Sequence, residues 1–105
     1  MAFPTVEFAA SFRGLGHLEG GMPAYSVPWD ISARGAIVVG ESQSANGREA
    51  YRWSADTGMV ALGSLGGADF FSTAWRISTE GLVIAGASRS PSSGTRTEAF
   101  RWTAE

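Results

Sequence analysis

The sequence predicts an all-β protein made of two copies of one four-stranded unit. Three observations lead to this prediction. A motif of about 45 residues occurs twice, the apolar segments are only five to seven residues long, and clusters of Gly, Ser, Asn and Pro separate them. Fourteen glycines, four tryptophans, six phenylalanines and two tyrosines among 105 residues also suit short strands and tight turns better than helices.

The internal repeat is the strongest of these observations. Over most of its length the two copies lie 46 residues apart, and the matched pairs are Ser26 with Ser72, Trp29 with Trp75, Ile31 with Ile77, Gly35 with Gly81, Gly40 with Gly86 and Ser42 with Ser88. Before this region, Gly63–Gly67 corresponds to Gly16–Gly21 with Glu19 inserted. After it, a three-residue insertion within residues 89–97 shifts the register, and Glu49–Trp53 returns as Glu98–Trp102. Insertions confined to loops are typical of a true structural repeat.

Each copy contains four short segments with the composition of β-strands. In the first copy they are Phe12–Leu18, Ser26–Ser32, Ala36–Ser42 and Glu49–Ser54, and in the second copy Met59–Leu65, Ser72–Ser78, Leu82–Ser88 and Glu98–Thr103. Gly35 and Gly81 each close a predicted hairpin turn, where glycine supplies a positive φ.

Four strands in about 45 residues are the size of one propeller blade. We therefore expect a β-propeller with two four-stranded antiparallel blades per chain, its ring completed by oligomerisation or by repeats outside this sequence. The expected organisation is an N-terminal extension over residues 1–11 and a two-blade unit over 12–105, with repeat 1 at about 12–56 and repeat 2 at about 59–105.

The repeated motif resembles a known family. The pattern Gly-x-Leu-Gly-Gly, then Ile-Ser-x-x-Gly-x-Val-x-x-Gly-x-Ser, then Glu-Ala-Phe-Arg-Trp is similar to the HAF repeat of predicted extracellular bacterial proteins, and it covers Phe12 to Trp102. The resemblance implies a propeller-like array and an extracellular or periplasmic location, and it implies no catalytic residues. Two features depart from the family: Glu49 and Glu98 stand where it has its histidine, and Trp29 and Trp75 lie near a position that is usually small or polar.

Composition excludes several classes of function. The formal charge is −2 and the eight basic residues are all Arg, which argues against binding to nucleic acid or an anionic membrane. No apolar run approaches the roughly 18 residues of a membrane span. The chain has no cysteine, so it has no disulfide, no thiolate metal site and no cysteine nucleophile. The first residues carry acidic Glu7 and no basic segment, unlike a secretory signal.

The number of strands predicts self-assembly. Phe12–Leu18 repeats Met59–Leu65, which we expect to be the outermost strand of the first blade, so the second blade lacks its own. Two blades cannot close a ring, whereas propellers have about four to eight. We therefore expect a cyclic homo-oligomer, a trimer before a tetramer, in which Phe12–Leu18 pairs with Glu98–Thr103 of the next subunit. The alternative is that the repeats close only within a longer protein.

The sequence offers no catalytic, metal-binding or cofactor-binding constellation. His17 is the only histidine, and its counterpart in the second repeat is Ser64. Without a second histidine or any cysteine, a zinc site has no support. Glu41 corresponds to Ala87, so no pair of carboxylates is predicted, and no Gly-x-Ser-x-Gly nucleophile motif is present. We expect no catalytic residues, no metal and no cofactor.

Trp29 and Trp75, with their neighbours Asp30 and Arg76, are the candidate ligand-binding residues. They lie on strands expected next to the propeller axis, where repeated indole rings could stack against sugar rings; the competing interpretation is that both tryptophans pack between blades. We expect a non-enzymatic module for binding or scaffolding, lectin-like in its use of tryptophan, with a carbohydrate or a protein as ligand. The alternative is a hydrolase or lyase whose site forms where subunits meet on the axis.

Overall fold

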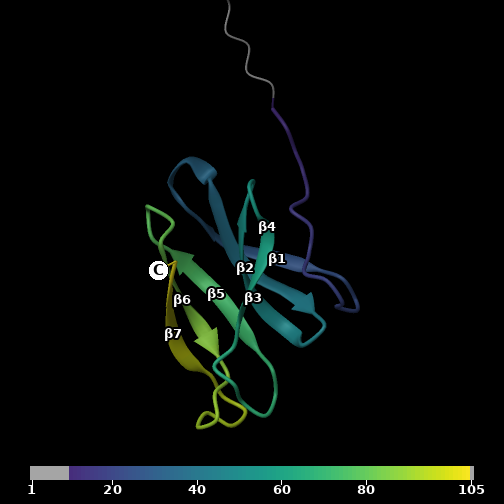
Figure 1. The fold of residues 1–105 in the computed structure, drawn as a ribbon, viewed down its shortest axis with the longest axis vertical. Coiled ribbons are helices and arrows are strands. Elements are labelled where there is room, and N and C mark those ends of the chain that lie inside the picture. Colours follow the sequence, from purple (N-terminus) through teal and green to yellow (C-terminus); the bar gives the residue numbers. More distant parts are fainter. Residues whose placement is uncertain (1–9, 105) are drawn as a thin grey trace, which may run out of the picture.

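The computed structural model describes residues 10–104, and most of the N-terminal extension expected over residues 1–11 lies outside that range. Seven strands form two antiparallel sheets that lie beside each other (Figure 1). The first sheet has the order β1-β2-β3-β4 and the second has the order β5-β6-β7. The strands are β1 (Ser26–Ile31), β2 (Ile37–Ser44), β3 (Gly47–Ser54), β4 (Gly58–Gly63), β5 (Ser72–Ile77), β6 (Val83–Ser88) and β7 (Glu98–Thr103).

The all-β class is confirmed by this arrangement. Strands β5, β6 and β7 repeat β1, β2 and β3 with the same connections, and the cross-strand pairs also correspond: Ser26 faces Ser42 as Ser72 faces Ser88. The sequence placed all seven strands within a few residues of their observed ends.

The predicted number of four strands is found in the first sheet only. The second sheet has three strands, because the chain ends its pairing at β7 and no described segment lies on the outer edge of that strand. The expected strand at Phe12–Leu18 is absent as well. Residues 10–18 form no ladder, and the purple segment that leads into β1 runs outside both sheets (Figure 1). Within residues 10–104 the two sheets do not close into a ring.

The hairpin turn of each repeat depends on a glycine with positive φ. Gly35 has φ 70° at the end of a short 3-10 turn (Ala33–Gly35), and Gly81 has φ 80° at the corresponding place. A Cβ atom on Gly81 would lie 2.9 Å from Cγ1 of Ile37. The second turn therefore needs glycine both for its backbone conformation and for its close approach to the first sheet.

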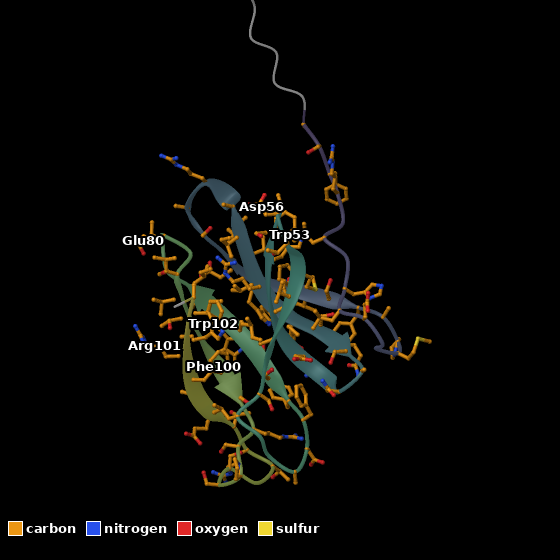
Figure 2. The ribbon with its side chains drawn as sticks, viewed as in Figure 1. Trp53, Asp56, Glu80, Phe100, Arg101 and Trp102 are labelled. Carbon is orange, nitrogen blue, oxygen red and sulfur yellow. The ribbon has the colours of Figure 1, made fainter. Side chains whose placement is uncertain are left out.

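The main core lies between the two sheets. Val39 and Ala50 from the first sheet pack with Ala74 and Ile84 from the second, and Phe100 and Trp102 are partly buried against them. Figure 2 shows Phe100 and Trp102 on one side of β7 and Arg101 pointing to the other side. This alternation is the period of two that a strand imposes.

A second apolar cluster covers the opposite face of the first sheet. Val38 and Tyr51 are buried there with Leu18, and Leu15, Trp53 and Met59 pack around them. The segment before β1 is therefore anchored to the first sheet at Leu15 and Leu18, although it forms no strand. Among residues 10–104 no helix has the length and apolar character needed to cross a membrane.

Candidate functional site

The two candidate tryptophans each occupy a β-bulge. In the β1–β2 pair the register shifts between Pro28 and Asp30, so Trp29 has no partner across the strands. The β5–β6 pair shifts in the same way between Ala74 and Arg76, which leaves Trp75 unpaired. A bulge turns its extra residue out of the ladder. The exposed fractions of the two side chains, 48% and 49%, follow from this geometry.

Because β1 and β5 lie next to each other, the bulges bring the two indoles together. Trp29, Trp75 and Arg76 line one open cavity of about 270 Å³, which we call the tryptophan cavity. In the single chain about half of each of these two residues is open to solvent. The cavity offers two aromatic faces and one guanidinium group, a combination that suits a ring with polar or anionic substituents.

Trp29 is held more firmly than Trp75. Its Nε1 donates a hydrogen bond to Oε1 of Glu41 at 3.1 Å, and the same oxygen accepts the hydroxyl of Thr73 at 3.0 Å. Arg48 Nε lies 3.0 Å from the other carboxylate oxygen of Glu41. Ala87 takes the place of Glu41 in the second repeat, and within residues 10–104 the Nε1 of Trp75 has no hydrogen-bond partner.

Asp30 joins the two sheets and is not directed at a ligand. One carboxylate oxygen accepts the N–H of Ile31 at 2.9 Å, and the other accepts the N–H of Ile77 in the neighbouring sheet at 2.8 Å. These two backbone hydrogen bonds, with the attraction of Arg76, hold the pKa of Asp30 below its ordinary value. Arg76 donates one N–H to the carbonyl of Trp75 at 2.8 Å, which leaves most of its donors available.

The structure thus brings three of the four predicted site residues together and gives the fourth a structural role. The repeat could not reveal Glu41, because comparison of the copies emphasises what they share and Glu41 occurs in only one of them. Its signal in the sequence is an acidic residue directly after the apolar run Ile37–Val39 and Gly40. His17 is exposed, and its Nδ1 lies 3.0 Å from the carbonyl of Leu18. In the described part of the chain no three His, Asp or Glu side chains gather as a metal site would require.

The repeated Glu-Ala-aromatic-Arg-Trp segments also take part in the contact between the sheets. Arg52 lies over the ring of Trp102 in the next sheet, with its Cζ 5.9 Å from the ring centroid, and donates to the carbonyl of Gly81 at 3.2 Å. The Arg52 guanidinium therefore stacks on an aromatic ring of the neighbouring sheet.

Fold and site together define an all-β repeat protein whose two sheets share an aromatic cavity. Comparison of the chain with family models, with curated proteins and with solved structures finds no match.

Proposed function

We propose that this chain is a non-enzymatic β-propeller repeat protein that binds a carbohydrate at its tryptophan cavity. The observation that carries the proposal is the pair of half-exposed indoles that equivalent bulges direct into one cavity beside Arg76. A soluble protein leaves two neighbouring tryptophans open to water at a cost in free energy, which a binding function explains.

The chemistry of the cavity favours a saccharide over a purely apolar ligand. The C–H face of a sugar ring stacks on indole, while its hydroxyl or carboxylate groups need donors at the edge. The cavity has hydrogen-bond donors in Nε1 of Trp75 and the remaining guanidinium N–H groups of Arg76. The hydrogen bond to Glu41 fixes the orientation of the Trp29 indole, which lines one side of the cavity. A saccharide that carries a carboxylate fits the positive charge of Arg76.

In the proposed homo-oligomer each subunit contributes one copy of the tryptophan cavity. In the proposed ring Phe12–Leu18 of one subunit meets Glu98–Thr103 of the next, and three subunits give six blades, with four subunits as the alternative. The β1 and β5 strands would surround the axis and repeat the tryptophan cavity in each subunit, so that weak binding to one sugar becomes avidity for a polymer. The similarity of the sequence to HAF repeats supports an extracellular or periplasmic setting, where such polymers occur.

A glycan array with purified protein tests the proposal. Trp29→Ala and Trp75→Ala are expected to abolish binding to the glycans that the parent chain retains. Val60→Ala is the matched control, because Val60 is 46% exposed on β4, at the other edge of the sheet from β1. Unchanged binding in both tryptophan variants would overturn the proposal. Release of shortened glycan from the array would favour the alternative, a hydrolase or lyase.

A further inference from the structure

We propose that Ser11–Gly16 of a second copy forms the fourth strand of the β5-β6-β7 sheet, with the Phe12 side chain as its anchor. The inference rests on the head-to-tail assembly of the proposed function and gives that contact a register, a pocket and a hydrogen-bond pattern. The repeat indicates which segment forms the fourth strand, because Phe12–Gly16 corresponds to Met59–Gly63, which is most of β4.

The end of Ser11–Gly16 is held against its own first sheet in the way that the end of β4 is held against the second sheet. The hydroxyl of Ser26 donates to the carbonyl of Gly16 at 2.6 Å, just as Ser72 donates to Gly63 at 2.6 Å. Leu18 N–H donates to Ser42 Oγ at 2.8 Å, and its counterpart Leu65 donates to Ser88 at 2.9 Å.

Even the backbone angles of the two copies correspond. Gly16 has φ 88° and Gly63 has φ 87°. The end of the free segment therefore sits against β1 and β2 as the end of β4 sits against β5 and β6. A strand placed beside it would occupy the position that β3 holds beside β4.

The register of the new pairing follows from the β3–β4 ladder. There Tyr51 faces Ala61, Arg52 faces Val60 and Trp53 faces Met59. Transfer of this ladder to the second repeat places Phe100 opposite Gly14, Arg101 opposite Arg13 and Trp102 opposite Phe12 of the partner copy. The pairing is shorter than the predicted Phe12–Leu18. Leu18, only 6% exposed, packs on its own first sheet.

A cavity beside β7 has the position that the anchor requires. It measures about 120 Å³ and is lined by residues 62–65, 88 and 100–102. Phe12 is fully exposed within its own chain. Its counterpart Met59 packs with Trp53 against the cluster that contains Leu18. By the same geometry Phe12 of the second copy reaches Trp102 and Leu65, which itself is 42% exposed.

Glu98 supplies a prepared hydrogen-bond acceptor. In the first sheet the Glu49 carboxylate accepts the hydroxyl of Ser44 with one oxygen, at 2.7 Å. Its other oxygen accepts the Gly63 N–H at 3.1 Å. In the second sheet Ser90 holds one oxygen of Glu98 at 2.8 Å, and among residues 10–104 the second oxygen has no partner. The N–H of Gly16 in the next subunit, the counterpart of Gly63, is the group that completes the arrangement.

Two like charges directly opposite each other are unfavourable, so the Arg13–Arg101 pair opposes the proposed contact. Another pair of side chains favours it. Between the two sheets of one chain, Glu41 faces Thr73 as a polar pair. At the corresponding place between copies, Ala87 meets Val27 and the pair is apolar. Both partners have changed together, as expected if the two surfaces contact each other. The contact between subunits is thus a continuation of the interface between the two sheets.

Engineered cysteines test the register, since the chain has no cysteine of its own. The double variant Arg13→Cys/Arg101→Cys places two thiols opposite each other across the new pair, within the distance typical of directly facing Cβ atoms. Mild oxidation is expected to give a covalent ladder that ends at the number of subunits in the ring. A mixture of the two single variants is expected to stop at dimers. Arg13→Cys/Arg96→Cys, with the second thiol in the distant loop, is the control that should remain uncoupled.

Variants of Phe12 test the anchor separately. Phe12→Ser is expected to raise the subunit dissociation constant by about 10- to 100-fold, whereas Phe12→Met, which copies the first repeat, should nearly preserve it. Because Phe12 makes no apolar contact in its own chain, circular dichroism should show both variants folded. A ring that persists in Phe12→Ser, together with no coupling of the thiols in Arg13→Cys/Arg101→Cys, would overturn this inference and leave the proposed function intact. A chain that stays monomeric without substitution would overturn both assembly proposals.

Discussion

The contact of Glu41 with Thr73 permits a sharp test of how the two sheets hold together. Glu41→Ala removes the acceptor for Trp29, Thr73 and Arg48. Trp29 and Arg48 are about half exposed and can turn to water, so the ion pair itself contributes little. The Thr73 hydroxyl is buried and loses its partner. An unsatisfied buried hydroxyl costs about 1–3 kcal/mol, and we expect a loss of about 2 kcal/mol in the free energy of unfolding.

The same structure predicts that a second substitution, at Thr73, restores at least half of that loss in the free energy of unfolding. Thr73→Val alone should cost about 1 kcal/mol, because the Glu41 carboxylate loses a donor. In the double variant the pair becomes Ala and Val, the combination that the chain carries at Ala87 and Val27. The hydroxyl that had no partner is then gone, and the double variant should be no less stable than Thr73→Val.

Urea denaturation at one fixed protomer concentration measures all four corners of the cycle. The expected coupling free energy is at least about 2 kcal/mol in favour of the double variant. If the two losses add within about 0.5 kcal/mol, Glu41 and Thr73 are independent and our description of the interface between the sheets is wrong.

Three further predictions concern single groups. Backbone hydrogen bonds hold the pKa of Asp30 below its ordinary value of 3.8, so its contribution to stability should be complete above about pH 4 and disappear as the pH falls through the lower folded value. Urea denaturation from pH 2 to 7 should show that the stability of Asp30→Asn falls less steeply at acid pH than that of the parent chain. An identical fall in both proteins would refute the role of Asp30. Burial raises the pKa of Tyr51 from 10.0 to about 12, so stability should fall between those pH values as only the unfolded chain ionises, and Tyr51→Phe should lose this dependence in the same assay. Gly81→Ala should lower the melting temperature more than Gly58→Ala, because both glycines have positive φ but only the Cβ at residue 81 meets a neighbouring side chain; equal losses in calorimetry would contradict the close approach to Ile37.

Much of the fold could be predicted because the repeat doubles every local signal. Trp29 and Trp75, or Gly35 and Gly81, support each other's assignment, and two copies of a weak strand pattern are stronger than one. The exact ends of the strands were harder to predict from the sequence. β2 and β3 extend to a tight turn at residues 45–46, whereas the sequence suggested a longer loop, because the second copy has its insertion at the corresponding place.

The second sheet has three strands where the sequence predicted four. A strand exists only where another edge pairs with it, and within residues 10–104 no edge pairs with Phe12–Leu18.

The candidate site could be predicted only in part. The repeat indicated Trp29 and Trp75, but the β-bulges that expose them depend on how the strands pair. The hydrogen bonds that Asp30 accepts from backbone N–H groups depend on the contact between the two sheets.

Measurement of the mass of the native chain in solution tests the assembly most directly. Light scattering during size-exclusion chromatography at micromolar concentration should show one species of about 33 kDa, three times the 11.0 kDa of a single chain. A ring of four would preserve the strand exchange and change the number of blades. A stable 11.0 kDa monomer would contradict the account, because the open edge of β7 and the exposed Phe12 would then need no partner.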